Sequence, residues 1–232
     1  MKKLPKTLLV TLCLLLPIII GGEARCGTEY PEDIAQRLQA RYDKIISLSF
    51  NFIQNTSGDL TGRPRQGSGK ASFVKLSGKS YMRWDYLSPD KQVLTSDGKT
   101  FSMYFAKLQQ MIVSPAETLD ADLTYAFFTG KGVLKKDFHI RPADEELQAE
   151  NSADFQVIKL IPKTPQSQVQ DIHLWVTADS LIRRIQIRDH FGTLTVLNFS
   201  DIVVNSLVGK NPQELLSFFS FVPPPGTEII RQ

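Results

Sequence analysis

Beyond its first 24 residues, the sequence lacks any long apolar run. Three lysines among the first six residues precede the apolar stretch Thr7–Ile20, and residues 22–24 (Gly-Glu-Ala) suit cleavage after Ala24. The stretch is shorter than the roughly 20 apolar residues of a membrane span. We therefore expect residues 1–24 to be an export signal and residues 25–232 to form one soluble, exported domain.

Cysteine and histidine are also scarce. Cys13 would leave with the signal, so Cys26 would remain alone and no intrachain disulfide is expected. Cys26 has no neighbouring histidine, which argues against a nucleophilic cysteine. The three histidines, His139, His173 and His190, have no second His or Cys at metal-ligand spacing. We accordingly predict no metal site.

The short motifs of common catalytic sites are missing too. The chain has no G-x-S-x-G elbow, no P-loop and no G-x-G-x-x-G. Residues 67–70 read G-S-G-K, but they lack the earlier glycine of a phosphate loop and precede a predicted strand. Asp90 and Asp97 are typical turn residues. These absences argue against an enzyme, and we predict no cofactor.

An excess of charge of either sign is absent as well. Removing the three signal lysines from 27 basic residues and Glu23 from 24 acidic ones leaves 24 against 23. This balance gives no reason to expect nucleic acid as a partner. Arg63, Arg65 and Lys107 either dock to acidic partners or are solvated surface, and solvated surface is the simpler interpretation.

Two stretches have helical periodicity. Pro31–Ile46 begins with proline and two acidic residues, which suit a first helical turn, and it predicts an amphipathic helix that packs on a core or covers an opening. Thr118–Thr129 predicts a second helix that ends at Gly130. The two apolar stripes are Ile34, Leu38, Tyr42 and Ile45, and Leu119, Leu123 and Phe127.

The remaining periodicity is that of strands. Ile185 and Ile187 alternate with polar residues, the pattern of a sheet with one wet face. Short strands at intervals of about 10 to 12 residues predict a mainly β fold with helices (α+β), built on a single curved antiparallel sheet. The predicted strands outside residues 81–113 are 48–54, 70–75, 138–141, 154–161, 170–177, 181–188 and 193–204.

Tyr81–Val113 predicts a β-hairpin around Asp97-Gly98. A two-residue Asp-Gly turn would place Leu94 opposite Phe101. One hairpin face then carries apolar side chains and no catalytic group, so it covers either a core or a ligand. That face carries Leu94, Phe101, Met103 and Phe105, and the other carries Val93, Thr95, Ser102 and Tyr104.

Several motifs in this order, after an export signal, resemble the outer-membrane lipoprotein carrier family LolA. No single motif is specific, but the ordered set extends over nearly the whole exported chain. The matching residues are Arg83-Trp84-Asp85-Tyr86 with Pro89; Leu94, Ser96-Asp97-Gly98-Lys99-Thr100 and Tyr104; Gly130-Lys131-Gly132 with Asp137-Phe138; and Phe219-Ser220-Phe221 with Pro223-Pro224-Pro225-Gly226 and Ile229.

The resemblance implies an unclosed β-barrel with a helical lid over a hydrophobic cavity. It implies a monomeric carrier in the periplasm, which takes acylated lipoproteins from an inner-membrane ABC transporter and passes them to an outer-membrane receptor. We expect the cavity to be lined by Phe50, Phe52, Phe73, Trp84, Leu94, Phe101, Met103 and Phe105. We expect the lid to contribute Ile34, Leu38, Tyr42, Leu123 and Phe127.

Two alternatives stay open. One is a lipid-anchored receptor of the same fold, although Arg25 stands before Cys26 where a lipoprotein signal has a small residue. The other is a periplasmic hydrolase, which would need histidine and carboxylates inside the cavity. The chain also departs from the resemblance at the lid latch: an Arg-Pro pair of the family is replaced near Lys75-Leu76, so Lys75 is the candidate latch.

Overall fold

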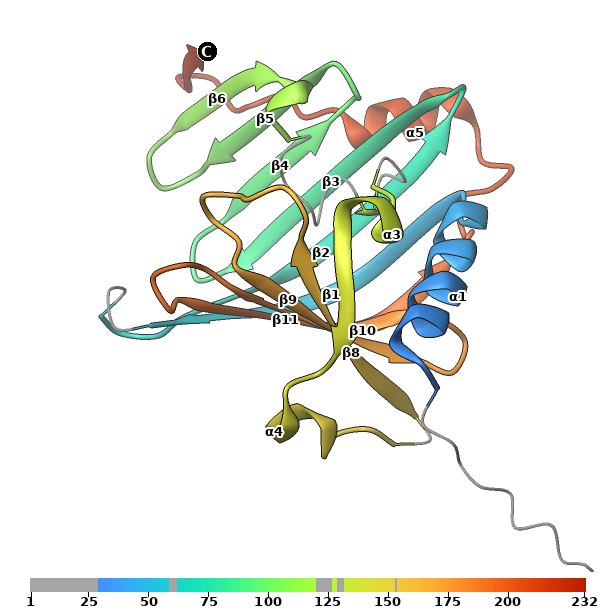
Figure 1. Ribbon diagram of the computed structural model, residues 1–232. Helices are drawn as coiled ribbons and strands as arrows, with labels where there is room; N and C mark the ends of the chain where they lie inside the picture. The colour runs from blue at the N-terminus through green and yellow to red at the C-terminus, as the bar shows by residue number, and fades with distance from the viewer. Residues whose placement is uncertain (1–28, 59–61, 120–126, 129–131, 153) are drawn as a thin grey trace, which may run out of the picture.

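The computed structural model describes residues 29–58, 62–119, 127–128, 132–152 and 154–232 (Figure 1). The predicted export signal and Cys26 lie outside the described residues. So do Leu123 and most of the predicted helix Thr118–Thr129. Among the described residues, no helix has the length and apolar character needed to cross a membrane.

The fold is a single sheet of twelve strands with a few helices. The strands are β1 (Ser47–Ser57), β2 (Arg65–Leu76), β3 (Lys79–Ser88), β4 (Gln92–Ser96), β5 (Thr100–Phe105), β6 (Gln110–Pro115), β7 (Phe138–Pro142), β8 (Phe155–Pro162), β9 (Asp171–Thr177), β10 (Ile182–Arg188), β11 (Leu194–Val204) and β12 (Glu228–Arg231). The helices are α1 (Pro31–Lys44), η2 (Ala116–Leu119), α3 (Leu134–Asp137), α4 (Glu145–Gln148) and α5 (Pro212–Phe219).

The sheet is curved but not closed. Its strand order is β12-β6-β5-β4-β3-β2-β1-β11-β10-β9-β8-β7, so β1 lies near the middle and pairs with β11. The predicted unclosed mainly β fold is confirmed. The prediction of a purely antiparallel sheet is wrong at one edge, because β12 pairs with β6 in parallel.

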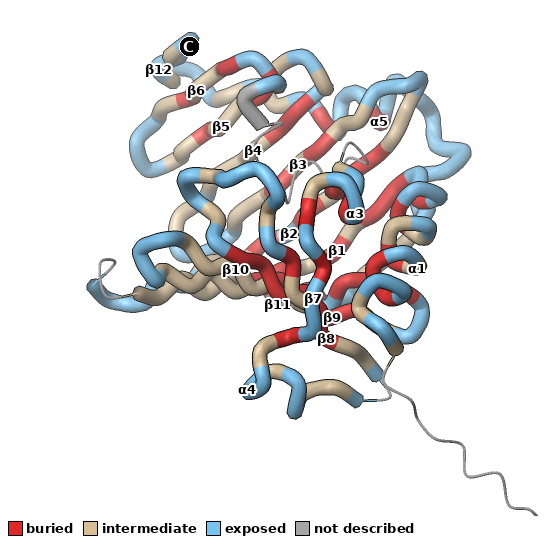
Figure 2. The backbone as a smooth tube through the Cα atoms, viewed as in Figure 1, coloured by how far each residue is buried: buried red, intermediate tan, exposed pale blue. Residues whose placement is uncertain are grey.

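Helix α1 confirms the first periodic stretch, ending two residues before the predicted end. Pro31 occupies its first turn, where a missing backbone N–H costs no hydrogen bond. Its apolar stripe packs into the main core and contacts β7 and β8. We call the face of the sheet that carries this core the inner face, and Figure 2 shows buried segments along the strands that form it.

Four residues, 97–100, separate the paired residues Ser96 and Phe101, so the predicted two-residue turn is wrong. Ser96 pairs with Phe101, and Leu94 pairs with Met103 instead of Phe101. The Asp97 carboxylate accepts hydrogen bonds from the backbone N–H groups of Lys99 and Thr100 at 2.9 and 2.7 Å, which stabilises the wider loop. The register slips by two residues, and because side chains alternate with period two, the predicted faces are unchanged.

The predicted hairpin is also larger than expected. Residues 79–115 form a four-stranded meander, β3 to β6, in which β4 and β5 are the central pair. Further C-terminal, α5 was not predicted. Asn211 caps it by accepting a hydrogen bond from the Gln213 N–H at 2.8 Å, and Pro212 follows in the first turn.

Candidate functional site

Three rows of side chains cross the inner face of β1 to β5. Each row follows from the strand register, and together the rows include all eight residues predicted to line a cavity. The rows are Leu48–Phe73–Met82–Ser96–Phe101, Phe50–Ala71–Trp84–Leu94–Met103 and Phe52–Gly69–Tyr86–Gln92–Phe105.

Small residues on β2 allow large rings on β1 and β3 to meet. Across Ala71, the rings of Phe50 and Trp84 are 5.8 Å apart in an edge-on arrangement. Across Gly69, the rings of Phe52 and Tyr86 are 4.8 Å apart. A Cβ at Gly69 would lie 3.0 Å from the Phe52 ring and would overlap a neighbouring backbone carbonyl. The result is a continuous aromatic surface, in which such ring pairs add to the burial energy.

Burial decreases from β1 toward β5 in the two rows that begin at Phe50 and Phe52, whereas the row that begins at Leu48 is buried throughout. Phe50, Phe52, Phe73, Trp84 and Phe101 are buried. Leu94 and Met103 are half-buried and pack against the main core, and Phe105 is also half-buried. The apolar face therefore extends beyond the part that the helices cover.

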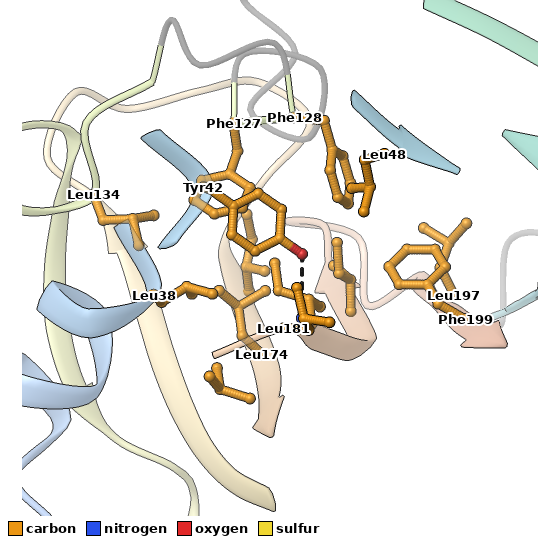
Figure 3. Packing of buried hydrophobic residues seen from close by; sticks show 14 of the residues in the cluster. Leu38, Tyr42, Leu48, Phe127, Phe128, Leu134, Leu174, Leu181, Leu197 and Phe199 are labelled. Atoms are coloured by element: carbon orange, nitrogen blue, oxygen red, sulfur yellow. Dashed lines mark hydrogen bonds between the residues drawn. The ribbon is translucent and has the colours of Figure 1, made fainter. Parts of the chain in front are cut away.

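Aromatic side chains of α1 and of residues 127–128 pack against the rows, and Figure 3 shows Phe128 beside Leu48 of the first row. Phe128 stacks on Phe73 with ring centroids 5.1 Å apart and lies 5.6 Å from Phe50. Tyr42 of α1 lies 4.6 Å from Phe127. Phe128 was not predicted, although it directly follows Phe127. Phe199 on β11, 4.4 Å from Phe50, was also missed, although it alternates with Leu197.

Two small gaps lie among the described residues of this interior. One of about 30 Å³ is lined entirely by apolar side chains, among them Phe127, Leu134 and Leu174. Another of about 10 Å³ lies beside Phe73 and Phe128. Neither has room for an acyl chain, since a single water already needs about 10–15 Å³ of such a cavity. Tyr42, Phe127 and Phe128 therefore occupy part of the space over the inner face.

Hydrogen bonds to Tyr42 connect the C-terminal end of α1 to the sheet. The Tyr42 hydroxyl accepts a hydrogen bond from the buried Ile182 N–H at 3.2 Å, and burial raises the pKa of this phenol. Lys75 Nζ donates to the Tyr42 carbonyl at 3.2 Å, and the Lys75 N–H donates to the Ile46 carbonyl at 2.8 Å. A cation at a helix C-terminus also interacts favourably with the helix dipole. The candidate latch residue thus contacts α1.

A second set of hydrogen bonds between α1 and the sheet was not predicted. Arg37 donates to the Thr177 carbonyl at 2.8 Å and to the Ser180 hydroxyl at 3.0 Å, both near the β9–β10 turn. It also pairs with Glu29 at 3.0 Å. Periodicity placed Arg37 on the polar side of α1. Nothing in the sequence indicated its hydrogen bonds to the β9–β10 turn, which lies 140 or more residues further along the chain.

The R-W-D-Y motif serves both faces of the sheet. Trp84 and Tyr86 point to the inner face, whereas Arg83 and Asp85 lie on the outer face. Arg83 forms a two-point ion pair with Asp85 and donates to the Phe218 carbonyl at 2.7 Å. Its guanidinium also lies 5.3 Å from the Phe218 ring. The motif therefore anchors α5 to the outer face.

A polar cluster is buried on the outer face of β8 and β9. His173 is fully buried, with ring nitrogens 3.4 Å from Asp144 and 3.5 Å from Asp171. Lys159 pairs with Asp144 at 2.7 Å. Burial lowers the pKa of His173, although the two carboxylates oppose this shift. Because the cluster faces away from the aromatic rows, it does not supply the acid–base groups that a hydrolase would need there.

The described residues contain no group of His, Cys, Asp or Glu side chains able to hold a metal ion. The inner face therefore offers an apolar, aromatic surface. Its chemistry is suited to hydrocarbon.

Comparison with known proteins decides the family. Residues 43–211 match the model of a family described as "Outer membrane lipoprotein carrier protein LolA". The chain belongs to this family. The match to LolA covers most of the sheet, from the end of α1 to the residue before α5.

Individual relatives agree over long alignments. An outer-membrane lipoprotein carrier protein from Nitrosomonas europaea is 26% identical, with 100% of both chains covered. One from Ralstonia nicotianae is 28% identical, covering 85% of this chain and 86% of the relative. A crystal structure of an uncharacterised conserved protein from Thermus thermophilus has a TM-score of 0.50 at 13% identity, covering 87% of this chain and 98% of that one, and supports the fold alone.

Proposed function

We propose that this protein is a periplasmic carrier that shields the acyl chains of lipoproteins. In this proposal, it receives them from an inner-membrane ABC transporter and passes them to an outer-membrane receptor, acting as a monomer. Membership of LolA and the names of the relatives support the carrier role. The predicted export signal at residues 1–24 supports the location.

Shielding is needed because hydrocarbon is costly to expose. Each buried CH₂ is worth about 0.8 kcal/mol, so an acyl chain of about 16 carbons represents more than about 10 kcal/mol. A carrier must cover this surface in transit. The carrier must also release the acyl chain, so the net free energy of binding has to stay well below the full burial energy.

The packing of Phe128 on Phe73 is the observation that carries the proposal. In the empty protein, lid side chains cover the aromatic rows. An incoming acyl chain has to displace Phe127, Phe128 and Tyr42, and the loss of their packing offsets part of the binding energy. This internal competition keeps binding reversible, so that a receptor with a more favourable cavity can accept the chain.

Binding of a fluorescent fatty-acid probe tests the site. Leu94 and Met103 are paired, half-buried and on the inner face, so Leu94→Asn with Met103→Gln removes apolar contact with little expected loss of the core. We expect probe affinity to fall at least tenfold, since burying each such side chain contributes on the order of 1 kcal/mol.

The matched control substitutes two half-buried apolar residues on the outer face of the same meander, Val93→Asn and Val113→Asn. We expect this variant to bind the probe like the wild type. Equal affinity of all three folded proteins would contradict the assignment of the inner face. Recovery of the exported protein from cells without copurifying lipoproteins would contradict the carrier role itself.

A further inference from the structure

Five chain connections lie at one end of the sheet. Because neighbouring strands from β6 to β8 are antiparallel, the β1–β2, β3–β4, β5–β6, β8–β9 and β10–β11 connections share that end. They follow one another along the left side of Figure 1. We call the described residues of these connections, with the strand ends beside them, the rim.

Three rim connections each present one large apolar side chain to solvent. Leu87, Leu108 and Phe191 are 56%, 62% and 69% exposed. Leu87 lies at the end of β3, Leu108 in the β5–β6 connection and Phe191 in the β10–β11 connection. Single exposed apolar residues are common on proteins, but here three occur at the same end of the sheet.

These side chains are held out by ordered turns. The Asp189 carboxylate accepts hydrogen bonds from the Phe191 N–H at 2.9 Å and the Thr193 N–H at 2.7 Å. Next to it, a hydrogen bond of 2.8 Å joins the His190 ring to the Gln166 carbonyl, which ties this turn to the β8–β9 connection. Leu87 is the extra residue of a bulge between β2 and β3, a feature that often redirects a side chain.

The exposed charges on the rim are mostly positive. Among its described residues, five exposed side chains are cationic, and these are Arg63, Arg65, Lys91, Lys107 and Lys163. One is anionic: Glu228, the first residue of β12, lies beside the β5–β6 connection and accepts a hydrogen bond from the Gln110 side chain at 2.7 Å. The other acidic side chains of the rim are less exposed: Asp171 is buried, Asp90 pairs with Lys107 at 3.5 Å, and Asp189 is engaged within its turn. Asp59, in the same β1–β2 connection, lies outside the described residues.

The opposite end of the sheet has a different character. The β4–β5 connection exposes Asp97 beside Lys99, and the β9–β10 turn exposes Asp179. With 24 basic and 23 acidic residues after the predicted signal, the chain has little net charge to distribute. The mostly cationic rim is therefore a local feature and not the consequence of a basic protein.

We propose that the rim is a docking surface for an anionic phospholipid bilayer. Apolar side chains surrounded by cations fit such a surface, because the chains enter the headgroup region while the cations meet lipid phosphates. The contact would be weak and reversible, as three side chains bury little area. This inference does not depend on acyl-chain binding by the inner face.

Cosedimentation of the exported chain with vesicles tests the proposal. We expect binding to phosphatidylethanolamine vesicles that contain phosphatidylglycerol, little binding to phosphatidylcholine vesicles, and a loss of binding as salt is raised. The triple variant Leu87→Ser, Leu108→Ser and Phe191→Ser should bind at least tenfold more weakly. Replacement of Arg63 and Lys163 by glutamine should weaken binding about fivefold per residue.

The matched control carries three serines at exposed apolar positions away from the rim, Val203, Val208 and Val222. It should bind vesicles like the wild type. Absence of binding to the anionic vesicles overturns the proposal, as does an equal loss in the control. Binding of the rim to the transporter's periplasmic domain, without binding to vesicles, also overturns it. Fatty-acid probe binding by the rim variant should be unchanged, which separates this test from that of the carrier function.

Discussion

The hydroxyl of Tyr42 allows a direct test of how α1 is bound to the sheet. It accepts a hydrogen bond from the Ile182 N–H at 3.2 Å, and both residues are buried. Tyr42→Phe keeps the ring and its 4.6 Å contact with Phe127. The substitution therefore removes one acceptor and leaves one backbone donor without a partner in an apolar interior.

The expected cost can be worked from this geometry. A buried donor left without its partner costs about 1–3 kcal/mol. For a domain of this size, each kcal/mol lowers the melting temperature by about 2–4 °C. We therefore expect Tyr42→Phe to melt about 2–12 °C below the wild type, measured by circular dichroism at neutral pH.

The same change should strengthen acyl-chain binding. If loading displaces α1, the hydrogen bond to Ile182 stabilises the empty form only. Its loss then lowers the cost of opening, and affinity for a fatty-acid probe should rise about 5- to 100-fold. A rise in affinity together with a fall in stability distinguishes a lid contact from an ordinary core contact.

Trp175→Phe provides the control. Its indole N–H donates to Glu150 at 2.9 Å in the second apolar cluster, on the outer face. This variant should lose stability without any change in probe affinity. Probe affinity that is unchanged or lower in Tyr42→Phe, with the variant folded, would refute the idea that α1 competes with the acyl chain.

Two further predictions concern charged groups. Lys75→Met should lower the free energy of unfolding by about 0.5–1.5 kcal/mol and raise the affinity for the fatty-acid probe, because the hydrogen bond to the Tyr42 carbonyl is lost. Lys75→Arg should retain most of the stability and a probe affinity near that of the wild type. Chemical denaturation measures the stability, and probe titration measures the affinity. Burial lowers the pKa of His173, so the unfolded chain binds a proton at higher pH than the folded one, and stability should fall as pH decreases below about 6.5. Melting curves at pH 7.5 and 5.5 should show this loss of stability, and the difference between the two pH values should be smaller in His173→Gln. If the substitution leaves the pH difference unchanged, the loss belongs to other titrating groups.

Much of the fold could be predicted from local patterns. Strands β7 to β11 lie within one or two residues of their predicted bounds, because alternation and turn residues are local signals. The faces of β4 and β5 were correct even though the register was not, since a slip of two residues preserves alternation. The turn itself was missed because the bonds made by the Asp97 carboxylate, and not the Asp-Gly pair, determine its length.

Local sequence patterns could not predict the contacts between segments that are far apart in the chain. The bonds of Arg37 to the β9–β10 turn and of Arg83 to α5 join residues more than 130 positions apart. The burial of His173 depends on the segment around Asp144, which covers the outer face of the sheet. Alternation along β9 predicts two faces, but it does not tell which of them another segment covers.

The gradient of burial along the aromatic rows bears on how an acyl chain would load. Phe50 and Phe73 are covered by Phe128, so hydrocarbon reaches them only after the lid side chains move. Leu94 and Met103, further along the sheet, are already half-exposed. A chain that first contacts these two residues gains apolar burial before any lid contact is lost. Each further methylene then offsets part of the cost of displacing Phe128, so opening can proceed in small steps and does not require one large fluctuation.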